Sequence, residues 1–276
     1  MRLASIGSGS SGNCIYAGND KTHILIDAGF SLKKTIAGLS AMDISYNDIQ
    51  ALLITHEHMD HIAGLGVFLR KHPVPVFATS KTIDKILSVR TLGKMDRSLF
   101  QPIRPDESFS FHDVAVEASE IYHDAADPVC YTLKDERSKV AVATDLGTFD
   151  DYLVEKLSGC ETLLIESNHD LSMLMAGPYP YPLKRRIMSN TGHMSNERAG
   201  QLLSKIIGDT CRHIYLGHLS KENNYSPLAY EAVKVELLLH NIDLEKKNIT
   251  MQVASRTDPT IAWKPDGADK KELQEV

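Results

Sequence analysis

Short apolar runs alternate with helical patterns along most of the chain. Strand-like runs lie near residues 2–6, 13–17, 23–27, 51–55, 75–78, 107–120, 128–134, 138–144, 161–166, 213–217 and 248–254. Helices are expected where a capping residue precedes a helical pattern, after Ser31, Asp150, Ser195 and Ser226, with Pro227 next to the last of these. The alternation predicts an α/β fold.

The pattern changes after the apolar run Ala51–Ile54, where residues 55–64 read THEHMDHIAG. This H-x-H-x-D-H cluster contains His56, His58, Asp60 and His61. Imidazole and carboxylate side chains without a thiolate suit zinc, iron and manganese. A helical pattern follows, so the cluster lies at a strand-to-helix junction, where functional loops are held by a rigid scaffold. The sequence therefore predicts a metal site, and a histidine-rich surface turn is the less favoured alternative.

The cluster resembles the second motif of the metallo-β-lactamase superfamily, and later residues fill the rest of that family's ligand set. His123 follows the alternating run 114–118, Asp145 follows the run 140–144, and His218 follows the run 213–217. The resemblance extends from about residue 3 to residue 254 and implies a four-layer αββα sandwich. Asp145 and His218 are too close in sequence to accommodate the inserted domain of the β-CASP relatives.

The resemblance also implies a dinuclear site. His56, His58 and His123 would hold one ion, Asp60, His61 and His218 the other, and Asp145 would bridge them. Two ions about 3.5–4 Å apart can hold a hydroxide nucleophile and bind both oxygens of a displaced group. Asp60 is expected to contribute to catalysis as well as to metal binding. Zinc, manganese and iron are not distinguished, because such ligands accept all three.

A second pair of residues is expected outside the metal ligands. Glu166 ends the run 162–165, and His193 lies in the motif GHMSNE. Their order resembles that of the tRNA-maturing and DNA- or RNA-processing phosphodiesterases of the superfamily. By that resemblance Glu166 orients His193, and His193 protonates the leaving oxygen as a general acid. The alternative is that His193 only helps to begin the helix after Ser195.

Four further stretches resemble the YycJ/WalJ (VicX) branch of the superfamily. They read IGSGSSGNC at 6–14, ESNHD at 166–170, YPYPLKRRI at 179–187 and HLSKENN at 218–224. The branch implies 5′→3′ exonuclease activity on double-stranded DNA. The substrate contacts expected within these stretches are Ser8, Ser10, Asn13, Lys184, Arg185, Arg186, Ser220 and Asn223. The Gly/Ser loop lacks the Lys-Ser/Thr ending of a P-loop, so no nucleotide cofactor is expected.

Charge is distributed unevenly along the chain. The formal net charge is −6, but residues 69–105 carry eight Lys and Arg against two Asp. Lys184, Arg185 and Arg186 form a second basic cluster. Local basic surfaces can contact phosphates on an acidic protein. Both clusters are candidate DNA contacts, and a solvated helix face or a charged turn is the alternative.

The chain of 276 residues is long enough for one large domain, which we place at 1–263 with a polar tail at 264–276. No apolar run is long enough to span a membrane, and no secretory signal is evident. The four cysteines form no C-x-x-C pair, which is typical of a reducing cytoplasm. The sequence does not indicate an oligomeric state.

Three alternative functions are open for a chain with these residues. A phosphodiesterase acting on small or cyclic phosphodiesters would use the same ions and the same His193. A thioester or lactone hydrolase would need no acid for its leaving group, so Glu166 and His193 argue against it. A regulatory binding protein with a vestigial site would not need the complete set of ligands.

Overall fold

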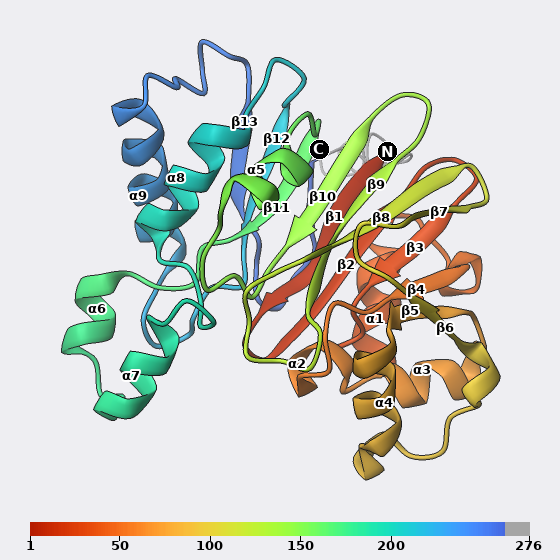
Figure 1. Cartoon of the computed structure of the whole chain (residues 1–276). Coiled ribbons are helices and arrows are strands. Elements are labelled where there is room, and N and C mark those ends of the chain that lie inside the picture. The colour runs from red at the N-terminus through yellow and green to blue at the C-terminus, as the bar shows by residue number, and fades with distance from the viewer. Residues whose placement is uncertain (263–276) are drawn as a thin grey trace, which may run out of the picture.

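The computed structural model describes residues 1–262, which form two seven-stranded sheets packed face to face (Figure 1). The first sheet has the order β14 (Thr260–Ile261), β1 (Arg2–Gly9), β2 (Gly12–Gly18), β3 (His23–Ile26), β4 (Ala51–Leu53), β5 (Val76–Thr79), β6 (Phe100–Ile103). The second has the order β13 (Thr250–Val253), β12 (His213–Gly217), β11 (Thr162–Glu166), β10 (Lys139–Ala143), β9 (Val129–Lys134), β8 (Val114–Glu120), β7 (Ser108–Phe111).

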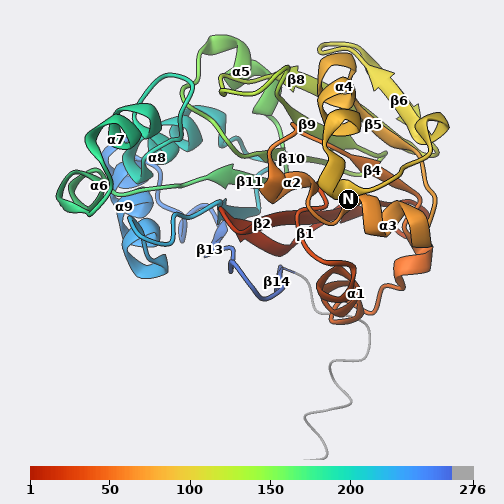
Figure 2. The same ribbon diagram turned by 90° about the horizontal axis from the view of Figure 1, so that it is seen from below.

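Helices lie on the outer side of each sheet (Figures 1 and 2). The first sheet is accompanied by α1 (Leu32–Ser40), α2 (Met59–Ile62), α3 (Leu65–Lys71) and α4 (Ser80–Ser88). The second is accompanied by α5 (Asp151–Leu157), α8 (Asn196–Ile206) and α9 (Ser226–Leu239), while α6 (Leu171–Ala176) and α7 (Tyr181–Ile187) project to one side. Short 3₁₀ turns occupy Tyr46–Asp48, Arg90–Leu92 and Arg97–Leu99. The predicted four-layer αββα sandwich is confirmed.

The strands read as continuous apolar runs because both of their faces are buried. In β3, Ile24 and Ile26 pack between the sheets, whereas Leu25 packs beneath the helices of the first sheet. In β10, Val140 and Val142 likewise point to the other sheet. Successive side chains of a strand point to opposite faces, so each strand joins two core layers.

Most predicted helix starts are confirmed by their caps. Ser31 accepts a hydrogen bond from the Lys34 amide, Asp150 from the Leu153 amide and Ser195 from the Arg198 amide. Such caps satisfy amides that lack a partner in the first turn. The last predicted helix begins at Ser226 itself, one residue earlier than expected.

Other predictions of local structure were incomplete. The single strand expected over 107–120 is a hairpin of β7 and β8, which turns at His112 with φ of 52°. Strand β6 and helices α6 and α7 were not predicted. The helix expected after the histidine cluster is interrupted, since α2 ends at Ile62 and α3 begins at Leu65. Gly64 lies at this interruption, and a Cβ there would lie 1.8 Å from the Phe30 carbonyl oxygen. This close approach holds the ligand-bearing helix α2 against the loop that follows β3.

The structure bears on three general predictions from the sequence: membrane spans, cysteine pairing and the extent of the domain. Within residues 1–262, no helix has the length and apolarity that crossing a membrane requires. The four cysteines are all buried and unpaired. The predicted tail at 264–276 lies outside the described residues, so the domain boundary stays a prediction.

Candidate metal centre

The predicted site residues converge at one edge of the sandwich, in the loops that follow strand ends. Strands β3 and β4 run parallel in the first sheet, and β10, β11 and β12 run parallel in the second. The carboxyl ends of parallel strands meet at one edge of a sheet, which is where α/β proteins place their ligands. The strand ends, loops and helix α2 at this edge, together with the loop after β8, carry Asp27, His56, His58, Asp60, His61, His123, Asp145, Glu166 and His218.

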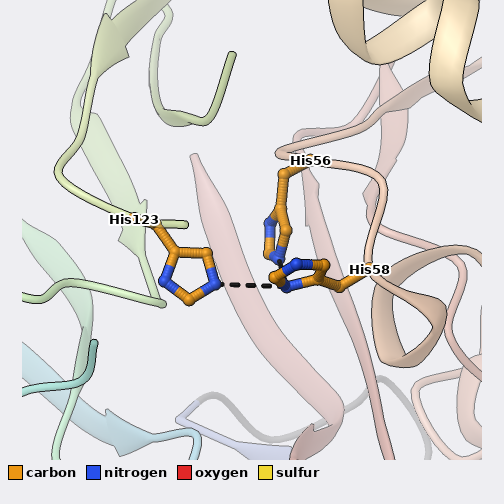
Figure 3. A group of neighbouring side chains, drawn as sticks. All are labelled: His56, His58 and His123. Atoms are coloured by element: carbon orange, nitrogen blue, oxygen red, sulfur yellow. Dashed lines mark hydrogen bonds between the residues drawn. The ribbon is translucent and has the colours of Figure 1, made fainter. Parts of the chain in front are cut away.

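Three histidines form the first group of candidate ligands (Figure 3). Nδ1 of His58 lies 3.1 Å from Nε2 of His56 and 3.2 Å from Nε2 of His123. The Gly192 carbonyl accepts a hydrogen bond from Nδ1 of His123 at 3.2 Å. In a neutral ring this leaves the lone pair on Nε2, directed at the other two rings. Converging imidazole nitrogens of this kind form a site for a cation.

Asp60, His61 and His218 form the second group. Oδ2 of Asp60 lies 3.3 Å from Nε2 of His218 and 3.5 Å from Nε2 of His61. On the outer side, Nδ1 of His61 donates to Asp27 at 2.7 Å, which orients the ring. Burial opposes charge on His61, but the carboxylates of Asp27, Asp145 and Asp60 raise its pKa well above the ordinary value. A bound cation would replace the proton that this pocket attracts.

Asp145 lies between the two groups. Its Oδ2 is 3.1 Å from Nε2 of His61, and its Oδ1 is 3.6 Å from Nε2 of His123 and 3.5 Å from Nδ1 of His218. The side chain is buried, yet Oδ2 accepts no well-directed hydrogen bond. A buried carboxylate oxygen without a donor is costly. The residues present therefore fit a metal ion, which would give this oxygen its missing partner.

Three residues of the site have left-handed backbones. The φ angles are 62° at Asp27, 59° at Asp145 and 56° at His218. This region is sparsely populated by residues other than glycine, and such strain costs on the order of 1–3 kcal/mol per residue. The surrounding fold holds these positions, because the Asp27 amide donates to the Leu53 carbonyl and the His218 amide to the Ser8 hydroxyl.

Glu166 connects two histidines rather than one. Its Oε1 accepts hydrogen bonds from Nδ1 of His193 at 2.9 Å and from Nδ1 of His218 at 2.8 Å. Its Oε2 accepts from the backbone amides of Leu146 and Met194. Burial opposes ionisation of Glu166, but the charges and hydrogen bonds of His193 and His218 lower the pKa of Glu166 to about 2. Burial likewise opposes charge on His193, and Glu166 raises the pKa of His193 above its ordinary value.

The residues expected to contact substrate in the Gly/Ser loop are mostly turned inward. Ser8 and Asn13 are buried, with Oγ of Ser8 3.0 Å from Oδ1 of Asn13. Nδ2 of Asn13 lies 3.1 Å from Nε2 of His61. Ser10 is exposed at the tip of the β1–β2 turn. Ser8 and Asn13 therefore support the candidate ligands His218 and His61, and Ser10 remains open to solvent.

Two further expected substrate contacts, Ser220 and Asn223, are buried beside His218. The Asn223 amide donates to the Ser220 hydroxyl at 3.2 Å. Both side chains therefore shape the loop after β12, and neither reaches the surface.

The three basic residues of α7 differ in their surroundings. The Lys184 side chain is buried and donates to the carbonyls of Met175 and Gly177, at the end of α6. The position of Lys184 does not favour the predicted phosphate contact, because its ammonium is buried and two of its three N–H groups already bond carbonyls. Arg186 binds Asp124, the neighbour of His123. Arg185 is exposed, as expected of a residue that contacts a ligand.

Part of the basic charge over 69–105 is also used within the protein. Nη1 of Arg70 donates to the carbonyls of Leu92 and Lys94. Nη1 of Arg104 lies 3.5 Å from Oε1 of Glu107, and Nζ of Lys81 lies 3.6 Å from Oδ1 of Asp127. The segment is therefore a weaker candidate for DNA contact than its composition indicates.

A buried network of amides, which the sequence did not indicate, joins the loops of Glu166, His193 and His218. Oδ1 of Asn196 accepts from the Ser167 hydroxyl at 2.7 Å and from Nδ2 of Asn224 at 2.8 Å. Nδ2 of Asn168 donates to the His218 carbonyl at 2.9 Å. Fully bonded buried networks of this kind fix one arrangement of the chain.

Comparison with known proteins identifies the family. The family described as "Beta-lactamase superfamily domain" matches residues 22–218. Exodeoxyribonuclease YycJ from Bacillus anthracis is 38% identical over 233 residues, which cover 84% of this chain and 88% of that protein. Exodeoxyribonuclease WalJ from Streptococcus pneumoniae is 39% identical over 231 residues, covering 83% of this chain and 86% of that protein. The chain belongs to the YycJ/WalJ family. The resemblance drawn from its motifs is confirmed.

Solved structures share the family's fold at low sequence identity. The metallo-β-lactamase fold protein YhfI from Bacillus subtilis has a TM-score of 0.66 at 16% identity, covering 95% of this chain and 99% of its own. The short form of human tRNase Z has a TM-score of 0.64 at 14% identity, covering 94% and 98%. In this fold, the grouped histidines and carboxylates indicate binding of divalent metal ions.

Proposed function

We propose that this chain is a metal-dependent phosphodiesterase that acts on nucleic acid as a 5′→3′ exonuclease on double-stranded DNA. The observation that carries the proposal is the complete ligand set beside a histidine held by a buried glutamate. The YycJ and WalJ relatives, which match over most of both chains, are named exodeoxyribonucleases and support the same substrate class.

Two divalent ions are proposed, of zinc, manganese or iron. His56, His58 and His123 would hold one ion, and Asp60, His61 and His218 the other, with Asp145 shared between them. When bound, such ions activate water and neutralise charge on the phosphate. Asp60 would help to place the attacking water, because it lies at the partly exposed side of the cluster.

His193 would serve as the general acid. Its Nδ1 is held by Glu166, and the same nitrogen lies 3.7 Å from Oδ1 of Asp145, so the ring stands at the edge of the ligand cluster. The raised pKa favours the protonated ring. A departing alkoxide needs a proton, and a positioned imidazolium can deliver it. Glu166 orients His193 and His218 together, which couples the acid to the second ion.

A substrate panel tests the proposal. The protein, supplied with Mn²⁺ or Zn²⁺, is incubated with 5′- and 3′-labelled duplex DNA, single-stranded DNA, a cyclic nucleotide and a thioester. We expect stepwise release of nucleotides from the 5′ ends of the duplex. Cleavage of the cyclic nucleotide without the duplex would assign a small-molecule phosphodiesterase instead. Cleavage of the thioester alone would exclude both.

Salt dependence separates a polymeric substrate from a small one. Activity on long duplex is expected to fall steeply as salt rises, because phosphate contacts release bound counterions. Hydrolysis of a nitrophenyl phosphodiester by the same preparation should change little. Arg185→Ala should flatten the salt dependence on duplex. Arg137→Ala is the matched control, because this exposed arginine lies in the β9–β10 turn, at the opposite edge of the sheet. Equal salt responses for the two substrates would contradict a DNA-binding surface.

A further inference from the structure

The segment from residue 171 to residue 192, here called the arm, differs in composition from the rest of the protein. It contains no Asp or Glu, although the whole chain has 36 acidic residues against 30 basic ones. Its charged residues are Lys184, Arg185 and Arg186. Figures 1 and 2 show α6 and α7 of the arm projecting from the sandwich beside the edge where the strand ends meet.

Helix α7 exposes a stripe of side chains that bind flat, apolar ligands well. Tyr181, Arg185 and Met188 follow one another at i, i+4 and i+7, which places them on one side of a helix. Tyr181 is 65% exposed and Met188 38% exposed, and Arg185 is also exposed. On α6, Leu171 and Met175 repeat the i, i+4 spacing at 42% and 51% exposure. Clustered exposure of large apolar side chains marks binding surfaces.

The arm is fixed to the site rather than loosely attached. Buried Lys184 joins α7 to the end of α6 through two carbonyls. Arg186 binds Asp124, whose amide in turn donates to the Thr191 carbonyl at 3.1 Å. The His193 amide donates to the Ile187 carbonyl at 2.9 Å. The end of α7 therefore lies directly against the residues that hold His123 and His193.

We propose that the arm binds unpaired nucleotides of the substrate next to the cleavage site. This inference rests on the proposed function and adds to it the part of the nucleic acid that is recognised. Bases stack on Tyr181 and Met188, and Arg185 contacts the phosphates or the base faces. Aromatic rings combined with cations are the usual platform for single strands, because every base has a π-face. Because the arm contains no carboxylates, its own side chains do not repel the phosphates of the substrate. A duplex with a single-stranded tail should therefore bind more tightly than a blunt duplex.

Binding is measured by fluorescence anisotropy with the metal-loaded full chain. The probes are a 12-nucleotide single strand, a blunt duplex and a tailed duplex, all with phosphorothioate linkages that resist cleavage. Tyr181→Ala should weaken binding of the single strand and of the tailed duplex by about 5- to 150-fold, the range of one base–aromatic stack. Tyr181→Phe, which keeps the ring, should bind as the wild type does. Leu239→Ala on α9 is the control, because Leu239 is 71% exposed and remote from the arm in sequence.

Two outcomes would overturn the proposal. Wild-type affinity in Tyr181→Ala would show that the ring is not a stacking platform, and would leave the apolar stripe for a protein partner. Equal affinity of the wild type for tailed and blunt duplex would show that the arm does not recognise unpaired nucleotides. Neither outcome bears on the proposed function. That function is tested separately, by the products that are released from a cleavable blunt duplex. Thermal unfolding of each variant checks that the change at this exposed position leaves the fold intact.

Discussion

Asp145→Ala is expected to lower the metal content of the protein more than replacement of any single histidine in the cluster. Its two oxygens lie within 3.6 Å of ring nitrogens from both histidine groups, so its loss affects both proposed ions. Elemental analysis of wild-type protein purified without chelator should approach about two equivalents per chain. The variant should fall below about one equivalent, because the remaining imidazoles lose their shared counter-charge.

Asp209→Ala is the control for this measurement, since Asp209 is a fully exposed carboxylate that precedes β12, at the end of this strand opposite His218. Its metal content should equal that of the wild type. The dinuclear arrangement would be refuted by a wild-type protein that reaches full activity with a single bound ion. It would also be weakened if Asp145→Ala retained as much metal as His58→Ala.

His193→Ala is expected to lower turnover on DNA on the order of 10²–10⁴-fold while the metal content stays unchanged. The chemical step loses its proton donor, but the proposed ligands remain in place. A nitrophenyl phosphodiester should recover much of the loss, because nitrophenolate departs without a proton. Rates measured on both substrates test the assignment. Equal losses on both would move His193 from catalysis to structure.

The pH dependence of activity gives a second test of the role of His193. Glu166 raises the pKa of His193, so the protonated acid persists to a higher pH than an ordinary imidazolium and is lost as the pH rises through the raised pKa. Wild-type activity on DNA should therefore decline on the alkaline side. His193→Ala should lack this decline. An unchanged alkaline decline in the variant would assign the titration to another group.

The candidate ligands could be predicted from the sequence because they lie in segments that follow buried strands. Runs such as 140–144 are recognisable as strands, and the fold brings their carboxyl ends to one edge regardless of distance along the chain. Asp145 and His218 are 73 positions apart, yet their side chains approach within 3.5 Å. A family motif together with strand ends therefore predicts seven candidate ligands, and the fold brings them together.

Residue type alone does not predict the role of a side chain where burial decides what it contacts. Lys184 looks like a surface cation in the sequence, but its ammonium lies against two carbonyls at the end of α6. The sequence places Ser8 in a Gly/Ser loop typical of substrate contacts, but Ser8 belongs to β1, and its hydroxyl accepts a hydrogen bond from the His218 amide. The amide network around Asn196 depends on three distant loops, and no local pattern encodes it. Long-range contacts of this kind are visible only in the folded chain.

The left-handed backbones at Asp27, Asp145 and His218 place residues of the candidate site in a conformation that lowers the stability of the fold. Glycine adopts this conformation without steric cost, so its substitution for any of the three residues would relax the backbone at that position. Laboratory evolution for heat resistance, carried out without an activity assay, would thus favour inactive descendants. Engineering a more robust version of this protein should hold these three positions constant and seek its gains elsewhere.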